Sequence, residues 1–249
     1  MKVIGVIPAR YKSTRFPGKP LALVHGIPMV VQVYKQAMKA ESLDGVVILT
    51  DDKRIYDVAI KYECHVMMTP EDCKNGTERL LRVFKGFKDT EGFVSIQGDE
   101  PLINPDDINM IVEGIRDENP ITTLIKKIRG NYEELNNKNV VKVAHGFDGR
   151  AVYFSRLPIP YHRDAGEQVY WKHIGIYGFT RETLRKIKKL KVSHLEDIEK
   201  LEQLKWLEHG IDIYTYETEH DAIGVDTLED LKKINENVPK ETIRNPHNE

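Results

Sequence analysis

The chain is short of cysteine, of long apolar runs and of net charge. Its 249 residues include two cysteines, Cys64 and Cys73, which form neither a C-x-x-C pair nor a cluster with histidine, so neither a disulfide scaffold nor a zinc site is expected. No apolar run approaches the roughly 20 residues that a membrane-spanning helix needs. The formal net charge of -2 argues against broad attraction to nucleic acid or anionic membrane. We therefore expect a cytoplasmic protein with reduced thiols, in which any anion site is local.

Two common nucleotide-binding motifs are also missing. The sequence contains no G-x-G-x-x-G fingerprint, and Lys19 is followed by Pro20 rather than by the Ser or Thr of a Walker loop. The apolar start, residues 3–7, is too short for a signal peptide and runs directly into Pro8 and Arg10. Any nucleotide site must therefore be built on a different kind of loop.

The loop that follows this first apolar run is the most informative segment of the chain. It reads P-A-R-Y-K-S-T-R-F-P-G-K-P and places four cations within ten residues, with no acid among them: Arg10, Lys12, Arg15 and Lys19. Residues 3–7 predict a buried strand, and open α/β sheets bind ligands at the carboxyl ends of their strands. Concentrated positive charge beside a flexible glycine suits a polyphosphate. The alternative is a solvated basic loop without a ligand.

Strand-like and helix-like runs alternate through the first half of the chain. Predicted strands cover residues 3–7, 46–50, 65–68 and 92–96, and predicted helices cover 28–40, 54–62, 77–87 and 105–116. This alternation is typical of a mostly parallel sheet with helices on both faces.

The second half has a different pattern. Predicted strands cover residues 121–128, 140–145, 151–155, 172–179 and 211–216, and helices cover 181–190, 195–208 and a stretch that begins near Thr227. We expect residues 120–175 to form a smaller antiparallel β insertion that serves sugar binding or dimerisation, by analogy with other folds. The chain length fits a single α/β domain over 1–238, followed by a disordered tail over 239–249.

Two acids that follow strands or turns are candidate metal ligands. Asp99 lies in Q-G-D-E-P, just after the predicted strand 92–96, at the sheet edge where the basic loop is expected. Asp226 lies in the turn G-V-D-T, where it could equally be the N-cap of the last helix. Carboxylates of this kind bind Mg²⁺ that bridges triphosphate oxygens, provided that the fold brings them together.

A second set of polar side chains lies among apolar ones. On a continuous helix over 195–208, Glu202 would lie one turn from Ile198 and Trp206, where a carboxylate needs a polar partner or solvent. His173 and Tyr177 have even spacing on a predicted strand, which places them on one face with room for a ligand over Gly175.

Alternatives remain open for this second set. A histidine in a strand is more often a satisfied core residue than a ligand. Arg156 could hold a carboxylate bidentately or could be an ordinary surface arginine.

Taken in order, the motifs closely resemble those of the 3-deoxy-manno-octulosonate (Kdo) cytidylyltransferase family, the CMP-Kdo synthetases. The resemblance extends from Val3 to Leu231 and rests on the basic loop, N-G-T-E-R-L, Q-G-D-E-P, Y-F-S-R-L-P-I-P-Y, K-H-I-G-I-Y-G, L-E-Q-L and G-V-D-T. The version Y-F-S-R-x-P-I-P-Y is most similar to the capsule-associated branch. The resemblance implies a Rossmann-like fold of the nucleotide-diphospho-sugar transferase type.

The resemblance also implies roles for individual residues. The triphosphate of CTP would be held by Arg10, Arg15 and Lys19, with Arg15 and Lys19 acting in catalysis. Further nucleotide contacts would come from Pro8, Ala9, Gly76, Thr77, Arg79 and Gln97. Mg²⁺ would be bound by Asp99 and Asp226. The sugar acid would be bound by Arg156, His173, Tyr177, Glu202 and Gln203.

The implied reaction joins CTP and Kdo to give CMP-Kdo and pyrophosphate, for lipopolysaccharide or capsule synthesis, in a cytoplasmic enzyme that is expected to be a homodimer. Two positions depart from the family pattern: Asn75 replaces the usual Ser, and Lys205 replaces the usual Arg. The same reaction on another 2-keto sugar acid, either 8-amino-Kdo or a sialic-type acid, is therefore an alternative. A sugar 1-phosphate nucleotidyltransferase is disfavoured because its glycine-rich start is missing. A non-enzymatic nucleotide-binding protein is the remaining alternative.

Overall fold

Contacts between Cα atoms divide the chain into two units. The structure, a computed structural model, describes residues 1–12, 16–164, 168–221 and 223–237. The first unit contains residues 4–88, 95–105 and the described part of 222–249, whereas the second contains residues 1–3, 89–94 and 106–221. The predicted tail over 239–249 lies outside the described residues. The prediction of a single domain over 1–238 stays a prediction.

The first unit contains the parallel strands that the sequence predicts. Strand β1 (Val3–Ala9), which begins one residue before this unit, pairs in parallel with β4 (Val46–Thr50), and β4 pairs in parallel with β5 (Val66–Met68). All five residues of β4 are buried, as expected for a parallel strand that is covered on both faces. The antiparallel pair β2 (Leu23–Val24) and β3 (Ile27–Pro28) forms a separate small sheet.

Helices alternate with these strands. The helices of the first unit are α1 (Met29–Ala37), α2 (Lys53–Lys61), α3 (Gly76–Val83) and α9 (Leu228–Asn237), and short 3₁₀ helices cover Lys19–Leu21 and Phe84–Gly86. Asp52 caps α2 by accepting a hydrogen bond from the Arg54 N–H at 2.9 Å, which explains why the helix begins directly after β4.

The second unit carries the mixed part of the sheet. Its strands run in the order β11 (Ile213–Glu217), β7 (Ile121–Ile128), β10 (Tyr170–Thr180) and β6 (Gly92–Ser95), where the last residue of β6 belongs to the first unit. Strand β7 is antiparallel to β10 and parallel to β11, and β8 (Lys142–His145) is antiparallel to β9 (Ala151–Ser155). The expectation of antiparallel strands within 120–175 is confirmed.

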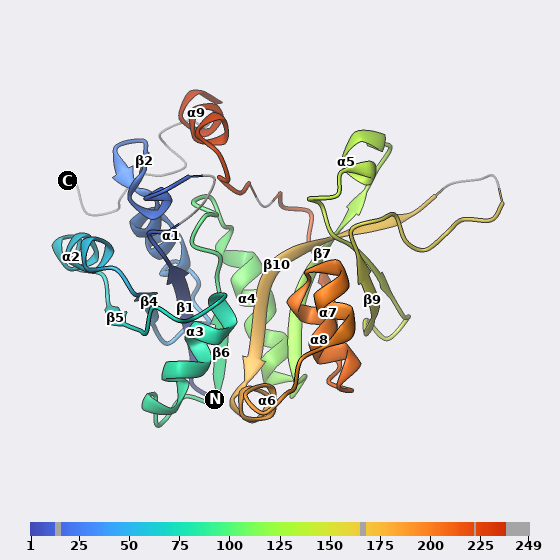
Figure 1. Ribbon diagram of the computed structural model, residues 1–249, viewed down its shortest axis with the longest axis horizontal. Helices are drawn as coiled ribbons and strands as arrows, with labels where there is room; N and C mark the ends of the chain where they lie inside the picture. The colour runs from blue at the N-terminus through green and yellow to red at the C-terminus, as the bar shows by residue number, and fades with distance from the viewer. Residues whose placement is uncertain (13–15, 165–167, 222, 238–249) are drawn as a thin grey trace. The chain divides into compact units, whose positions relative to one another are not determined.

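The helices of this unit also follow the sequence pattern, except that α5 was not predicted and that one predicted helix is broken. They are α4 (Pro105–Arg116), α5 (Tyr132–Asn136), α6 (Arg181–Ile187), α7 (His194–Glu199) and α8 (Glu202–Glu208). The continuous helix expected over 195–208 is wrong: Lys200 adopts a left-handed conformation (φ 54°, ψ 45°) and separates α7 from α8 (Figure 1).

The fold is therefore mixed α/β with a mostly parallel central sheet, as the sequence predicts. The separate antiparallel sheet of β2 and β3 was not predicted. Within the described residues, no helix is both long and apolar enough to cross a membrane.

A small apolar cluster fixes the carboxyl-terminal helix of the first unit. Buried residues from opposite ends of the chain meet there: Phe16, Val24, Met29, Val225 and Ile234. The Asn235 side chain also bonds the β2–β3 turn, accepting from the His25 N–H at 2.7 Å and donating to the Leu23 carbonyl at 3.1 Å. Helix α9 is consequently held against the hairpin, and the residues before it are brought to the basic loop.

Candidate functional site

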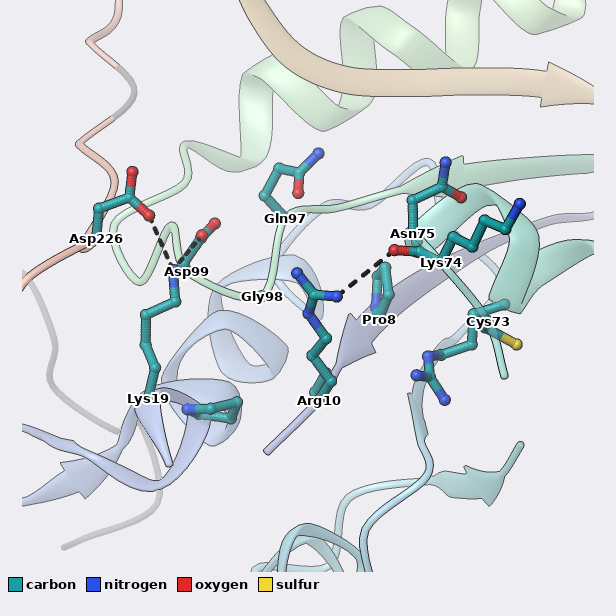
Figure 2. A pocket seen from close by; sticks show the side chains of 14 residues that line it. Pro8, Arg10, Lys19, Cys73, Lys74, Asn75, Gln97, Gly98, Asp99 and Asp226 are labelled. Atoms are coloured by element: carbon teal, nitrogen blue, oxygen red, sulfur yellow. Dashed lines mark hydrogen bonds and ion pairs between the residues drawn. The ribbon is translucent and has the colours of Figure 1, made fainter. Parts of the chain in front are cut away.

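A cavity of about 340 Å³ lies in the first unit at the carboxyl end of β1 (Figure 2). Most of the nucleotide and metal residues predicted from the sequence line it: Pro8, Ala9, Arg10, Lys19, Gly76, Arg79, Gln97, Asp99 and Asp226. The lining contains four cationic side chains (the three predicted and Lys74) and two acidic ones, so it is suited to a strongly anionic ligand. Arg15 lies outside the described residues.

Lys19 joins the two predicted metal carboxylates. Its Nζ lies 2.6 Å from Oδ2 of Asp99 and 3.1 Å from Oδ1 of Asp226, although 207 residues separate the second pair. Figure 2 shows the lysine reaching up to the two acids from the loop below them. The Lys19 side chain is 15% exposed, whereas Asp99 and Asp226 are 31% and 52% exposed. Both carboxyl groups are therefore open to a ligand in the cavity.

Backbone contacts explain how Asp226 arrives beside Asp99. The Val225 N–H donates to the Asp99 carbonyl at 2.9 Å, and the Val225 side chain is fully buried in the apolar cluster. The capping interpretation of Asp226 is wrong, because Thr227 caps α9 instead: its Oγ1 accepts from the Asp230 N–H at 3.2 Å, and Asp230 returns a bond to the Thr227 N–H at 2.9 Å. The Asp226 carboxyl group is consequently directed at Lys19 rather than at the helix.

The position of Lys19 depends on the shape of the basic loop. Gly18 has φ 73°, a left-handed conformation that glycine adopts without steric cost, and its N–H donates to the Tyr11 carbonyl at 3.0 Å. A Cβ at Gly18 would lie 3.1 Å from the Tyr11 ring. The Arg54 guanidinium stacks on the Tyr11 ring, with its Cζ 3.3 Å from the ring centroid. The short 3₁₀ helix that contains Lys19 starts directly after this turn.

The start of α3 forms another wall of the cavity. Asn75 caps the helix by accepting from the Glu78 N–H at 2.8 Å, and Glu78 accepts from the Lys74 N–H at 2.8 Å. Asn75, one of the two positions that depart from the family pattern, is thus the N-cap of α3. A Cβ on Gly76 would lie 2.7 Å from Cγ of Pro8, so glycine permits this close packing.

Gly98 makes a similarly close approach to β1. A Cβ there would lie 2.7 Å from the Pro8 carbonyl oxygen, a backbone atom that cannot move aside. Gly98, Pro20, Cys73 and Lys74 line the cavity but were not among the predicted site residues. The sequence could have indicated Lys74 as a site residue, because it is a cation directly before the helix cap Asn75.

Arg79 is more constrained than a base-reading residue needs to be. Its guanidinium forms an ion pair with Asp51 at 2.8 Å and a short hydrogen bond to Thr69, and its side chain is only 3% exposed. Asp51, the partner of this arginine, directly follows β4. Thr77 is buried within α3, at 4% exposure. Arg79 therefore joins α3, which forms one wall of the cavity, to the segment that follows β4.

The carboxylates fit a magnesium ion by their chemistry. They converge on one cationic group, and hard carboxylate oxygens are the ligands that Mg²⁺ takes. Among the described residues, no group of three or more His, Cys, Asp or Glu side chains could hold a metal. Two carboxylates suffice here because Mg²⁺ commonly completes its shell with water and substrate phosphates.

The predicted sugar-acid residues lie in the second unit. The rings of His173 and Tyr177 are 5.3 Å apart between centroids, so the expectation of room for a ligand between them is wrong. A register shift between Ile174 and Tyr177 in the pairing of β10 with β7 interrupts the regular strand at this point. His173 Nε2 lies 2.9 Å from Oγ1 of Thr123, and burial lowers the pKa of His173 to about 3. The imidazole is therefore neutral.

Glu202 and Gln203 are the first two residues of α8. Because α7 ends before them, Glu202 does not lie one helical turn from Ile198, which is 64% exposed, and that expectation is wrong. Trp206 of α8 packs edge-on against Tyr177, with ring centroids 5.0 Å apart. Burial, and secondarily the charge of Glu202, raises the pKa of Tyr177 well above its usual value, so the phenol stays protonated. Gln203 is buried, and Lys205 lies 3.9 Å from Glu196 of α7.

The Arg156 guanidinium forms hydrogen bonds with main-chain carbonyl groups. It donates these bonds to the carbonyls of Lys138, Glu199 and Lys200, at 2.9, 2.8 and 3.3 Å. The two remaining N–H donors of its five are what a sugar carboxylate could use. Its role in sugar binding stays a prediction.

Comparisons with known proteins identify the family of the chain. A family profile described as "Cytidylyltransferase" matches residues 4–213. The 3-deoxy-manno-octulosonate cytidylyltransferase of Fusobacterium nucleatum is 43% identical over 236 residues, which cover 94% of this chain and 96% of the relative. The enzyme of the same name from Parabacteroides distasonis is 42% identical over 246 residues, covering 94% and 96%.

Solved structures extend the comparison. A structure of CMP:2-keto-3-deoxy-manno-octonic acid synthetase complexed with CTP has a TM-score of 0.91 and 38% identity, covering 95% of this chain and 98% of the other. A thymidylyltransferase structure from Bacillus anthracis, with TM-score 0.64, 17% identity and 94% coverage of both chains, shares the fold alone. On the evidence of its sequence relatives and of the family profile, the chain belongs to the 3-deoxy-manno-octulosonate cytidylyltransferase family, the CMP-Kdo synthetases.

Proposed function

We propose that this protein joins CTP and Kdo to give CMP-Kdo and pyrophosphate. The C2 hydroxyl oxygen of Kdo forms a bond to the α-phosphorus of CTP, the bond from that phosphorus to pyrophosphate breaks, and the hydroxyl proton passes to solvent. The observation that carries the proposal is the convergence of Asp99 and Asp226 on Lys19 inside a cationic cavity. The names and the CTP complex of its relatives support the choice of substrates.

Positioning and charge neutralisation account for the catalysis in this proposal. Arg10, Arg15 and Lys19 bind the triphosphate, and Lys19 stabilises the negative charge that develops on the leaving pyrophosphate. The wall formed by Gly76, Arg79 and the start of α3 holds the nucleotide base, with Gln97 bordering it. No covalent intermediate is needed, because the incoming sugar hydroxyl displaces pyrophosphate directly.

Magnesium is part of the proposal. Asp99 and Asp226 would hold the ion, which would supply neutralisation of phosphate charge and a lower pKa of the attacking hydroxyl. The convergence of these two carboxylates, whose oxygens are the ligands that Mg²⁺ takes, supports a magnesium site here.

The sugar acid is assigned to the polar residues of the second unit. In this proposal Tyr177 donates its phenolic proton, neutral His173 offers a ring nitrogen, and Glu202 and Gln203 bind sugar hydroxyls. Arg156 contributes its remaining donors to the sugar carboxylate. The retained phenolic proton of Tyr177 and the neutral state of His173 support hydrogen bonding rather than proton transfer as their task.

We also propose a cytoplasmic homodimer that serves lipopolysaccharide or capsule synthesis. The two thiols are free, as expected in a reducing compartment. Large apolar side chains on and around β9 are exposed, among them Val152 at 68% and Leu157 at 60%, and such side chains are commonly covered by a second subunit. Sedimentation at a mass twice that of the chain is the result expected for the dimer.

Pyrophosphate release with CTP and Kdo tests the function. We expect Mg²⁺-dependent turnover by the wild type, and loss of about a thousandfold or more in kcat for Asp99→Asn and for Asp226→Asn, because each removes a metal carboxylate. Both variants should still bind CTP within an order of magnitude of the wild type, measured by calorimetry. Asp57→Asn is the matched control, because Asp57 is an exposed aspartate of α2 that forms an ion pair with Lys53 and does not line the cavity.

The alternatives give different results in the same assay. Faster turnover with 8-amino-Kdo or a sialic-type acid than with Kdo would assign the reaction to that sugar instead. CTP binding without pyrophosphate release from any sugar acid would identify a non-enzymatic nucleotide-binding protein. Near-normal rates for either carboxylate variant at saturating Mg²⁺ would contradict the metal assignment.

A further inference from the structure

We infer that Glu199 is a positioning residue for the sugar acid, acting through the turn that joins α7 to α8. The inference rests on the proposed function, since it concerns how the sugar-acid residues at the start of α8 are held. Glu199 itself is the last residue of α7, and all the contacts that carry the inference lie within the second unit.

Both carboxylate oxygens of Glu199 are bonded to the end of β9. The Ser155 hydroxyl donates to Oε1 at 2.8 Å, and the Arg156 N–H donates to Oε2 at 3.1 Å. The same hydroxyl accepts from the Leu157 N–H at 3.0 Å, so its orientation is fixed. One side chain therefore attaches the end of a helix to the end of a strand 44 residues earlier. Bonds of this kind, with a charged acceptor, are stronger than neutral ones.

The Arg156 side chain in turn bonds to the main chain at the end of α7. Its Nε donates to the Glu199 carbonyl at 2.8 Å, and its Nη2 donates to the Lys200 carbonyl at 3.3 Å. Helix carbonyls at a carboxyl terminus have no partner within the helix, so this guanidinium satisfies two groups that the helix break leaves over. The carboxylate and the guanidinium together close a reciprocal clamp around the turn.

A buried lysine holds the clamp from the other side. Lys142 is fully buried, and its Nζ donates to the Arg156 carbonyl at 2.7 Å and to the Val140 carbonyl at 2.6 Å. Burial, followed by the charge of Arg156, lowers the pKa of Lys142. The charge of Glu199 acts in the opposite direction, so the acid also compensates the two cations around it.

The clamp lies between the two groups of sugar-acid residues. On one side, Phe154 of β9 packs on His173 with ring centroids 5.1 Å apart. On the other side, the left-handed Lys200 leads through Leu201 to Glu202, the first residue of α8. Helix α8 contacts β9, and Figure 1 shows α7, α8 and β9 grouped together. Releasing the clamp would therefore free the start of α8 from β9 without removing any residue proposed to touch the sugar.

Glu199→Gln tests this role with little change in volume. The amide replaces one carboxylate oxygen with an NH2 donor and removes the negative charge, so it cannot accept at both positions, from Ser155 at one and from the Arg156 N–H at the other. We expect KM for Kdo to rise about tenfold or more, as the loss of one hydrogen bond to a charged group predicts. KM for CTP should stay within about twofold, because the nucleotide cavity belongs to the first unit. Calorimetric titration with Kdo in the presence of CTP should show the same weakening.

Two further variants accompany it. Ser155→Ala removes one half of the clamp and keeps the carboxylate, so a smaller rise in the same parameter is expected. Glu182→Gln is the control: it makes the same substitution at an exposed glutamate of α6 that forms an ion pair with Lys186. This control should leave both KM values unchanged.

The outcomes separate the inference from the proposed function. Wild-type turnover with an unchanged KM for Kdo in Glu199→Gln would overturn the inference alone. Equal increases in both KM values, or a lower kcat with both KM values unchanged, would also overturn it, because the defect would then not concern the sugar. A wild type that does not convert CTP and Kdo would overturn the proposed function, and the inference with it.

Discussion

At the scale of single residues, the molecule places ionisable groups where burial decides their charge. His173 is packed between Phe154 and Tyr177 and bonded to Thr123, and burial lowers its pKa to about 3. An imidazole held neutral in this way acts as a fixed hydrogen-bonding group and does not titrate near neutral pH. Because the unfolded chain can protonate this histidine where the folded chain cannot, the free energy of unfolding depends on pH.

The sign of this dependence follows from proton linkage. Between about pH 6.5 and about pH 3, His173 takes up a proton in the unfolded chain but not in the folded one, so its contribution to stability is lost as the pH falls. Between pH 7 and pH 5, we expect the unfolding free energy of the wild type to fall by about 2 kcal/mol more than that of His173→Gln. Urea unfolding of both proteins at the two pH values measures the difference. Equal losses in the two proteins would contradict the assignment.

At the scale of secondary structure, the break between α7 and α8 is the decisive feature. Hydrophobic spacing alone favours one helix over this stretch, yet Lys200 takes a left-handed conformation that costs a residue with a side chain about 1–2 kcal/mol. The clamp formed by Glu199 and Arg156 stabilises this arrangement with bonds to both sides of the turn. The result is a short helix that begins at Glu202, whose charge acts on the Tyr177 phenol.

Substitutions at Lys200 test the left-handed conformation. Lys200→Gly should leave the unfolding free energy within about 1 kcal/mol of the wild type, because glycine removes the steric cost but adds chain entropy. Lys200→Val should lower it by about 1–2 kcal/mol, since a β-branched side chain is poorly tolerated at positive φ. The exposed ion pair of Lys200 with Asp197 is lost in both variants and cancels. Urea unfolding that ranks valine at or above glycine would show that the turn is not left-handed.

At the scale of the whole molecule, the chain passes between its two units at several places. Strand β6 has residues in both units, and residues 1–3 and 4–88 follow one another without a linker. Such interleaving means that neither unit is a continuous segment that a ribosome completes before the other begins. It favours cooperative folding of residues 1–238.

Calorimetry tests this cooperativity. We expect a single unfolding transition whose calorimetric and van't Hoff enthalpies agree, as for one domain. CTP at about 100 times its dissociation constant should stabilise the whole transition by about 2.7 kcal/mol, although its proposed contacts lie in the first unit. Two resolved transitions, of which CTP shifts only one, would contradict the prediction of a single domain.

Much of the local structure could be predicted from the sequence because its causes are local. Helix α4 occupies Pro105–Arg116 as expected, since proline at its first position and acids in its first turn are short-range signals. The basic loop after β1 and the antiparallel strands within 120–175 follow from charge and apolar patterns in the same way. The motif resemblance then indicated the family, which the comparisons confirm.

Only the tertiary structure decided which distant residues meet. A buried Val225 and its bond to the Asp99 carbonyl bring Asp226 to Lys19, and no short-range pattern encodes that contact. The partner of Arg79 proved to be Asp51 and the helix break proved to occur at Lys200, because ion pairing and clamping across the fold outweigh local propensity there. Local signals act over one or two turns of chain, whereas the candidate site is assembled from contacts that span up to 207 residues.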